Sequence, residues 1–164
     1  MRMLDDIERL AFQVIEAGTQ KGKKIVTAES CTGGLIAAAL TSISGASATF
    51  DRGFVTYDNN AKTDLLGVLP DRLNVFGAVS AEIADDMAAG ALAYSHADIA
   101  LSVTGVAGPN GGTEIKPVGL VFFGVATRDG RHVHVQSNLK GDRHEIRHQA
   151  VIEGLSLVLS ALEE

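Results

Sequence analysis

Residues 24–40 read KIVTAESCTGGLIAAAL, and the hydrophobic pattern changes twice within them. Residues 24–28 are rich in β-branched side chains, which predicts a short strand. Residues 33–43 are small and mostly apolar, which predicts a helix. Between strand and helix a serine, a cysteine and a threonine stand side by side, followed by two glycines. The stretch therefore predicts a strand–turn–helix unit with three candidate nucleophiles at its turn.

Helical and strand-like segments alternate along the rest of the chain. The pattern predicts further helices over 4–17, 60–66, 80–95 and 142–162, and strands over 52–57, 98–104, 120–127 and 132–136. We expect Gly18 to end the first helix, Ser80 to cap the helix that it begins, and Pro70 to lie in a connecting segment. Asp129-Gly130 predicts a hairpin between the last two strands, which argues against a purely parallel sheet. This order favours one layered α/β/α domain over residues 1–164, with helices flanking a mixed sheet.

The composition indicates a globular protein that does not bind nucleic acid. Of the 164 residues 46% are hydrophobic, and the net charge of −6 comes without a basic stripe that could contact phosphates. The single cysteine cannot form an intramolecular disulfide, which fits a reducing compartment. The first ten residues, MRMLDDIERL, carry acids where a signal peptide would carry bases, and no apolar segment has the length of a membrane span. We therefore expect a cytoplasmic protein.

Ser30 lies between the predicted strand and the predicted helix, and two interpretations of it are open. The N–H groups at a helix N-terminus could stabilise an oxyanion, and Gly33 and Gly34 would let a substrate approach the backbone closely. Alternatively, Ser30 or Thr32 only caps the helix, and Cys31 is a small buried hydrophobe. The G-x-S-x-G pattern of the hydrolase nucleophile elbow is absent.

Lys62 is the candidate base for such a serine, since it follows the predicted strand 52–57. A lysine can accept a proton near neutral pH only if burial or a neighbouring cation lowers its pKa. The alternative is an ordinary solvated surface lysine. Asp58 would oppose the role of a base if it paired with Lys62, because a nearby carboxylate raises a lysine pKa.

A rival motif lies near the C-terminus, where residues 144–148 read HEIRH. On a helix, His144 and His148 could bind zinc while Glu145 acts as a base. Arg147 would place a cation beside that metal, and no third ligand follows on the same element. We therefore expect no metal site, with a zinc hydrolase kept as an alternative.

Five segments in this order resemble the CinA C-terminal domain family, which includes stand-alone nicotinamide-nucleotide amidases. They are AESCTGGLIAAALT (28–41), GFVTYDNNAK (53–62), GAVSAEIADDMAAGA (77–91), SVTGVAGPNGGTEIKPVGLV (102–121) and GDRHEIRHQAV (141–151). The resemblance covers the chain from about residue 4 to residue 162. Many members carry a larger N-terminal domain that is missing here, so no activity of that domain is expected.

The resemblance implies an α/β fold and deamidation of nicotinamide mononucleotide to nicotinate mononucleotide with release of ammonia. It also implies a serine–lysine pair, which falls on Ser30 and Lys62, and it places the threonine of the TG-[aliphatic]-AGP motif on Thr104. Neither a metal nor another cofactor is required. A different class of function is also open: a non-catalytic module that binds a nucleotide or a protein partner.

The remaining candidate residues would bind the substrate, whose phosphate requires an anion site. We expect the backbone of residues 31–34 to hold the oxyanion, and Tyr57 and Thr104 to donate hydrogen bonds. The candidate phosphate ligands are a glycine-rich loop and two arginines four positions apart: Gly105, Gly108, Gly111, Gly112, Arg143 and Arg147. The alternatives are a tight connection for the loop and surface ion pairs with Asp142 or Glu145 for the arginines. The apolar helix at 81–95 leads us to expect a homo-oligomer.

Overall fold

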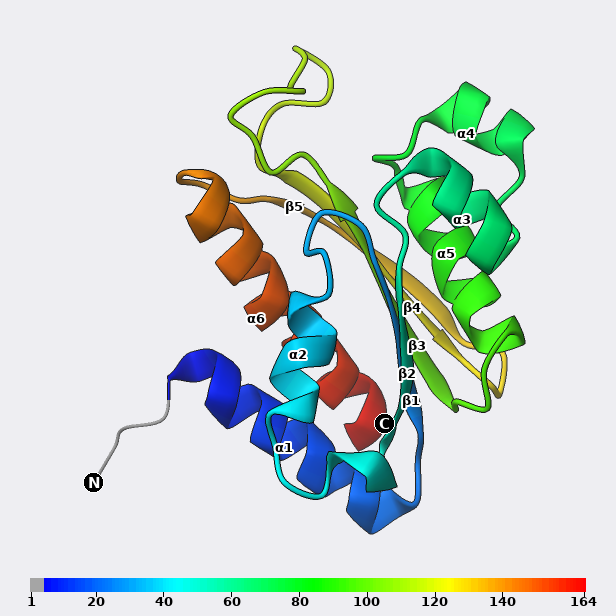
Figure 1. The fold of residues 1–164 in the computed structure, drawn as a ribbon, viewed down its shortest axis with the longest axis vertical. Helices are drawn as coiled ribbons and strands as arrows, with labels where there is room; N and C mark the ends of the chain where they lie inside the picture. Colours follow the sequence, from blue (N-terminus) through cyan, green and yellow to red (C-terminus); the bar gives the residue numbers. More distant parts are fainter. Residues whose placement is uncertain (1–4) are drawn as a thin grey trace.

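A computed structural model describes residues 5–164, which form a central five-stranded sheet with helices on both faces (Figure 1). In chain order the elements are α1 (Asp6–Lys21), β1 (Ile25–Glu29), α2 (Leu35–Thr41), a 3₁₀ turn η1 (Ala46–Ala48), β2 (Phe50–Val55), α3 (Asn59–Leu66), α4 (Pro70–Phe76), α5 (Ala81–Ala93), β3 (Ile99–Gly105), β4 (Leu120–Thr127), β5 (His132–Asn138) and α6 (Arg143–Glu163). Leu4, predicted to begin the first helix, lies outside the described residues.

The sheet is mixed, as predicted, with the strand order β2-β1-β3-β4-β5. Strands β2, β1 and β3 run parallel, with Ala28 opposite Phe54 on one side and Ser102 on the other. Strands β4 and β5 are antiparallel and form the predicted hairpin. The carboxyl ends of the three parallel strands therefore meet at one edge of the sheet.

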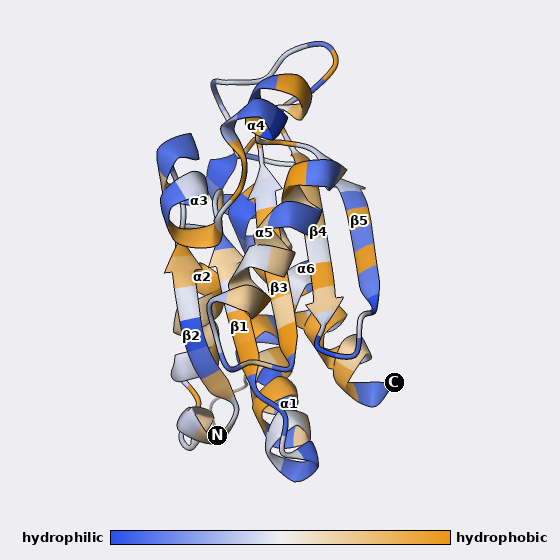
Figure 2. Cartoon of the chain, turned by 90° about the vertical axis from the view of Figure 1, so that its right-hand side faces the viewer, coloured by the Kyte–Doolittle hydropathy of each residue, from blue (hydrophilic) through white to orange (hydrophobic). Residues whose placement is uncertain are grey.

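Helices α1, α2 and α6 cover one face of the sheet, and α3, α4 and α5 cover the other (Figure 1). This arrangement confirms the predicted α/β/α layers, and each face has its own apolar core. Every residue of β1 is buried, because β1 lies inside the sheet and helices pack on both of its sides. The hydropathy colours are accordingly hydrophobic in the first part of β1 and of β3, whereas they alternate along the edge strand β5 (Figure 2).

Several predicted bounds differ by about two residues, such as the strand predicted over 52–57, which spans 50–55. Two further predictions, for Gly18 and Pro70, are wrong for a local physical reason. Helix α1 continues past Gly18 and ends at Gly22, whose φ of 64° gives the left-handed cap that favours glycine. Gly18 instead packs against Thr49, since a Cβ there would lie 2.4 Å from the threonine Cγ2. Pro70 does not lie in a connecting segment but begins α4, where its missing N–H breaks no helical hydrogen bond.

Helix α5, the expected oligomer interface, packs its apolar side against the sheet. Ser80 caps it as predicted by accepting from the N–H of Ile83. Its large apolar side chains, Ile83 and Met87, are fully buried in the core on that face of the sheet. These side chains are therefore not available for an interface with a second copy. The homo-oligomer stays a prediction.

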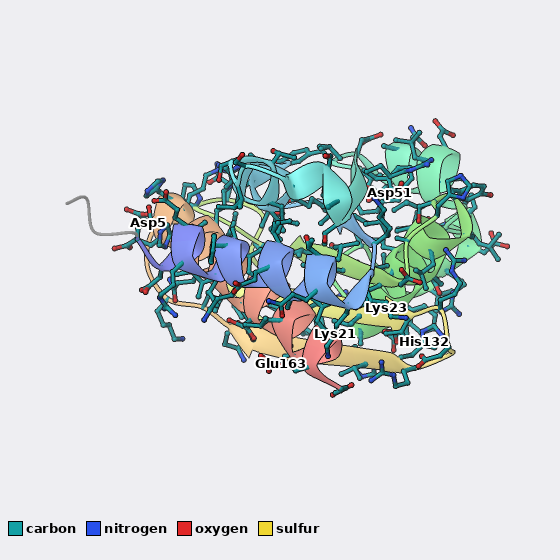
Figure 3. All side chains as sticks on the ribbon, turned by 90° about the horizontal axis from the view of Figure 1, so that it is seen from below. Asp5, Lys21, Lys23, Asp51, His132 and Glu163 are labelled. Atoms are coloured by element: carbon teal, nitrogen blue, oxygen red, sulfur yellow. The ribbon has the colours of Figure 1, made fainter. Side chains whose placement is uncertain are left out.

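The chain passes close to itself at the amino end of the sheet, where the last turns of α1 and α6 lie side by side (Figure 3). The Lys21 ammonium there donates to the Leu162 carbonyl. None of the helices within residues 5–164 has the length and hydropathy needed to cross a membrane.

Candidate functional site

The carboxyl ends of β2, β1 and β3 bring together three segments that are far apart in the sequence. Ser30 directly follows β1, Thr56 and Tyr57 follow β2, and the glycine-rich loop 106–119 follows β3. The chain leaves β1 toward β2 on one side and continues from β3 toward β4 on the other. Ligands of open α/β sheets bind at such an edge, where neighbouring connections diverge.

Ser30 begins a tight turn that leads into α2. Its N–H still donates to the Val103 carbonyl of β3 at 2.9 Å, and its own carbonyl accepts from Gly33 at 3.0 Å. Gly33 and Gly34 have φ values of 58° and 100°, which side chains rarely permit. The turn leaves the serine 9% exposed, at the boundary between core and solvent.

Lys62 reaches this serine from the opposite face of the sheet. It is the fourth residue of α3, and helical side chains lean toward the N-terminus, here toward the end of β2. Its Nζ donates to Ser30 Oγ at 3.0 Å, to the Thr56 carbonyl at 2.8 Å and to the Tyr57 carbonyl at 3.4 Å. The side chain is only 1% exposed, so the interpretation as a solvated surface lysine is wrong.

The electrostatic surroundings of Lys62 favour the neutral amine. Burial lowers its pKa below the ordinary 10.5, because the charged form loses its hydration. The charge of Asp58 acts in the opposite direction and is the smaller effect. Asp58 forms no ion pair with the lysine and instead caps α3, accepting from the N–H of Asn60 at 3.3 Å.

Cys31 is not a competing nucleophile at neutral pH. Its thiol is buried, and burial is the main reason that its pKa rises to about 12. A thiol with such a pKa is almost entirely protonated, and the thiolate is the nucleophilic form. Of the adjacent hydroxyl and thiol groups, Ser30 is therefore the one with a partner that could activate it.

Two of the first N–H groups of α2 itself are already occupied by a side chain of the protein. Glu29 is fully buried, and its carboxylate accepts from the N–H groups of Ile36 at 2.9 Å and Ala37 at 3.0 Å. Thr32 does not cap the helix but donates its hydroxyl to the same carboxylate at 2.6 Å. The preceding turn is different: in the described residues the N–H groups of Thr32 and Gly34 donate to no acceptor, and that of Cys31 donates to no backbone carbonyl.

The two candidate arginines of α6 contact the site rather than neighbouring acids. Arg147 donates to the carbonyls of Cys31 at 3.1 Å and Thr32 at 3.2 Å. Arg143 donates to the Gly108 carbonyl at 2.8 Å and to the Tyr57 hydroxyl at 2.9 Å. The alternative of ion pairs with Asp142 or Glu145 is wrong, because those two residues form a capping box at the start of α6.

The other predicted ligands make contacts that support the strand and the loop in which they lie. Thr104 is buried and donates its hydroxyl to the Ala78 carbonyl at 2.8 Å, so it joins β3 to the start of α5. Gly105 and Gly112 allow close packing, since a Cβ at either would lie within 3.0 Å of loop or strand atoms. Gly108 and Gly111 have φ values of 76° and 87° and shape the loop.

The HEIRH segment does not form a zinc site in the described residues. Glu145 is engaged in the capping box, where its carboxylate accepts from the N–H of Asp142 at 2.7 Å. The rings of His144 and His148 are exposed, with centroids 6.4 Å apart. Within residues 5–164 no group of three or more His, Cys, Asp or Glu side chains could hold a metal ion. The alternative of a zinc hydrolase therefore has no support from the geometry.

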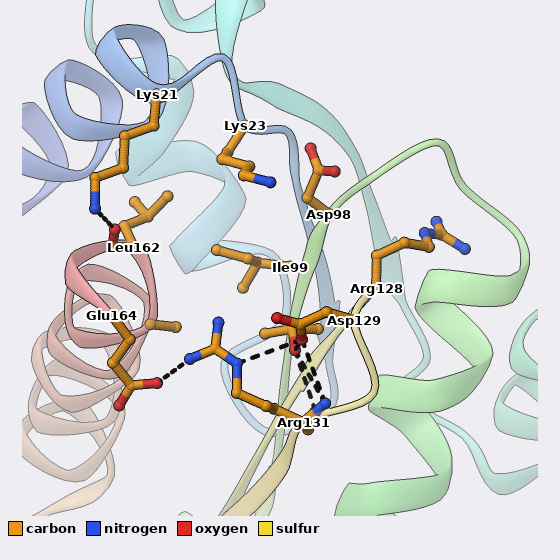
Figure 4. Close-up of a pocket in the computed structure, with 11 residues that line it drawn as sticks. Lys21, Lys23, Asp98, Ile99, Arg128, Asp129, Arg131, Leu162 and Glu164 are labelled. Atoms are coloured by element: carbon orange, nitrogen blue, oxygen red, sulfur yellow. Dashed lines mark hydrogen bonds and ion pairs between the residues drawn. The ribbon is translucent and has the colours of Figure 1, made fainter.

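A separate cavity of about 210 Å³ lies at the opposite end of the sheet (Figure 4). Its lining includes Lys21, Lys23, Asp98, Arg128 and Arg131, and it contains none of the predicted site residues. Four cations and three acids surround it, and most of these charges already have partners in the protein. Its size alone does not make it the candidate active site.

Comparison with known proteins places these features in a family. The family model of the CinA C-terminal domain matches residues 7–162. The chain belongs to the CinA C-terminal domain family. A nicotinamide-nucleotide amidohydrolase, PncC, from Enterobacter agglomerans is 48% identical over 153 residues, which are 93% of each chain.

Two further relatives define how far the likeness extends. The crystal structure of the competence/damage inducible protein CihA from Agrobacterium tumefaciens is 49% identical with a TM-score of 0.94, covering 100% of this chain and 99% of that one. A putative competence-damage inducible protein from Caldicellulosiruptor saccharolyticus is 53% identical over 88% of this chain, but only 35% of its own length takes part. The family fold therefore occurs both alone and as part of longer proteins.

Two contributors to the site were missed in the sequence. Glu29 ends an otherwise apolar buried strand, and a carboxylate at that position was the available signal. The Thr56 carbonyl contributes a backbone atom, which no residue type reveals. Among the predicted residues, the structure brings together Ser30, Lys62, the turn 31–34, Tyr57, Gly108 and both arginines.

Proposed function

We propose that this protein is a nicotinamide-nucleotide amidase that hydrolyses the carboxamide of nicotinamide mononucleotide through Ser30 and Lys62. The observation that carries the proposal is the distance of 3.0 Å between Lys62 Nζ and Ser30 Oγ, with the lysine buried and the serine at the solvent boundary. The substrate is taken from the names of the amidohydrolase relatives, which match this chain over nearly its whole length.

The three acceptors around Lys62 support its role as a general base. A neutral amine has two N–H groups and one lone pair. If the N–H groups donate to the carbonyls of Thr56 and Tyr57, the lone pair faces Ser30 Oγ. The same atoms also suit the ammonium, which donates to all three oxygens. The lysine can thus gain and lose a proton without moving.

The reaction then follows in two steps that return the enzyme to its starting state. Ser30 Oγ forms a bond to the carboxamide carbon while its proton passes to Lys62, and the carbonyl oxygen becomes an oxyanion. The C–N bond breaks, and the lysine proton leaves with the nitrogen as ammonia. Water next attacks the acyl ester, gives its proton to Lys62 and releases nicotinate mononucleotide, and the lysine returns the proton to Ser30 Oγ.

The mouth of the site offers groups that fit the rest of the nucleotide. Tyr57 is 59% exposed, and Arg143 holds its hydroxyl while contacting the loop at Gly108. The two hydrogen bonds of Arg143 leave three of its five N–H donors for a phosphate. Arg147 is assigned a different role, since its guanidinium holds the turn that follows Ser30.

The test measures ammonia release from nicotinamide mononucleotide by the wild type and by Ser30→Ala, each with and without a strong chelator. We expect Ser30→Ala to lose at least about 10³-fold in kcat/KM, as expected for the loss of a nucleophile. Chelator should change neither enzyme. Ser42→Ala is the matched control, because that hydroxyl caps a carbonyl at the far end of the same helix. Full turnover by Ser30→Ala would disprove the serine mechanism, and a wild type without turnover would disprove the substrate.

A further inference from the structure

Glu29 is a buried carboxylate at the carboxyl end of β1, without a salt-bridge partner in residues 5–164. It is 0% exposed, ends β1 and directly precedes Ser30. No salt bridge involves it in the described part of the chain. A buried charge is costly unless hydrogen bonds compensate its lost hydration, so this residue requires an explanation beyond packing.

Hydrogen bonds from a single segment provide that compensation. All three partners of Glu29 are donors that follow Ser30 in the chain: the Thr32 hydroxyl and the N–H groups of Ile36 and Ala37. Acceptance of three donors by two oxygens is the pattern that a carboxylate provides and that an amide side chain cannot. Glu29 thus connects Thr32 of the turn to the first residues of α2.

Arg147 also holds this turn, since its guanidinium donates to the carbonyls of Cys31 and Thr32. Between the two charged groups the N–H of Thr32 remains without an acceptor, although Thr32 is 0% exposed. Buried backbone N–H groups are almost always paired, and an exception points to a group that arrives during function. The neighbouring N–H of Cys31 donates to no backbone carbonyl of the described chain.

We propose that Glu29 is a positioning residue for the amide hydrolysis, which holds the turn so that the N–H groups of Cys31 and Thr32 receive the oxyanion. The inference rests on the proposed function, because the oxyanion is that of the carboxamide adduct on Ser30. Helix α2 itself does not serve as the oxyanion site, since Glu29 occupies its first free N–H groups. The carboxylate contacts no substrate and acts only through the turn.

The first test compares Glu29→Gln with the wild type in steady-state kinetics. The amide NH₂ of glutamine would oppose one of the three donors and displace the turn. We expect kcat to fall by about 10- to 100-fold while KM stays within about threefold, because oxyanion contacts exist only in the transition state. Glu29→Asp, which keeps the charge, should retain more activity than Glu29→Gln. A purely structural role would lower the unfolding temperature and leave kcat of the folded enzyme unchanged.

Asp98→Asn is the matched control at the other end of β1. Asp98 also accepts a backbone N–H, that of Lys24 at 2.8 Å, and its replacement removes the same charge. It lies outside the proposed site, so kcat should stay within about twofold of the wild type. If Glu29→Gln does not fold, Thr32→Val provides the second variant, since it removes one donor to Glu29 and keeps the backbone N–H. We expect a three- to tenfold fall in kcat for it.

A reagent that reacts with Ser30 separates this inference from the proposed substrate. The rate of covalent labelling by an alkyl phosphonofluoridate, followed by intact mass, depends on the serine and its anion site and not on nicotinamide. Slower labelling of Glu29→Gln by tenfold or more supports the positioning role even if the wild type does not hydrolyse the nucleotide. Labelling and kcat within twofold of the wild type in the folded variant would overturn it, whether or not the wild type is an amidase.

Discussion

The two ends of the sheet both gather charged side chains, but they hold them in different ways. At the carboxyl end, Glu29 and Lys62 are buried, and each is bonded to backbone atoms of the site. At the amino end, Lys21 and Arg131 lie around an open cavity and pair with the C-terminal turn of α6 (Figure 4). The exposed charges keep most of their hydration, whereas burial of the charges at the carboxyl end costs free energy of folding.

This contrast favours the carboxyl end of the sheet as the candidate site. A buried lysine with a lowered pKa beside a serine is destabilising for the fold, and such groups gather at functional sites. The cavity at the other end is lined by no buried titratable side chain of the described residues. The free-energy cost of burying titratable side chains, and not the presence of a cavity, therefore indicates the candidate site. The predictions below test that distinction.

The largest effect is expected for Lys62→Met, which keeps the length of the side chain and removes the amine. We expect kcat/KM to fall by about 10²- to 10⁴-fold, the usual contribution of a general base. Lys23→Met at the opposite end is the control, because that lysine is exposed and lines the other cavity. Equal activities of the two variants in ammonia release would show that the buried lysine is not the base.

Lys62→Met should also change how the free energy of unfolding depends on pH. Because the pKa of Lys62 is lower in the folded state than its ordinary 10.5, the unfolded chain binds the proton to a higher pH. Unfolding therefore takes up a proton between the lowered pKa and about 10.5, and stability rises with pH across that window. Lys62→Met should lack this rise in urea unfolding measured at several pH values. Parallel curves for the two proteins would contradict it.

Asp58→Asn should change activity less than Lys62→Met does, and it should raise kcat/KM at acid pH where Lys62→Met lowers it. The Asp58 charge raises the pKa of Lys62, so its removal should lower that pKa further. The acid limb of the profile of kcat/KM against pH should move to lower pH by less than about one unit, with activity gained on that side. Asparagine still caps α3, so the helix should persist.

Asp64→Asn is the matched control for this change, since it removes one charge from the exposed side of the same helix. Its profile should coincide with that of the wild type. If the profile of Asp58→Asn stays in place or moves to higher pH, the acid limb does not arise from the titration of Lys62.

The sequence could predict those parts of the structure that depend on local chemistry. The Asp129-Gly130 turn located the hairpin, and β4 has the predicted bounds of 120 and 127. The serine and lysine could be paired through the family motifs, although 32 residues separate them. Both are positions where residue type and neighbouring pattern carry the signal.

The remaining features depend on tertiary contacts with backbone atoms, which residue types do not reveal. Two glycines could have ended α1, and only the approach of Thr49 to Gly18 decides between them. The spacing of Arg143 and Arg147 suggested a shared anion, whereas the carbonyls of Cys31, Thr32 and Gly108 take up much of their donor capacity. Glu29 looked like an ordinary strand residue because its three donors come from the turn that follows.

The smallest effect is expected at the amino end, for Arg131→Gln. Arg131 pairs with Asp129 at 3.3 Å and with Glu164, but its side chain is 44% exposed, so water already screens both pairs. The free energy of unfolding should therefore change by less than about 1 kcal/mol. Ammonia release should stay within about twofold of the wild type, because no contact joins this arginine to the turn at Ser30. A large loss of activity with a normal unfolding curve would show that the two ends of the sheet are coupled, and the contrast drawn between them would then fail.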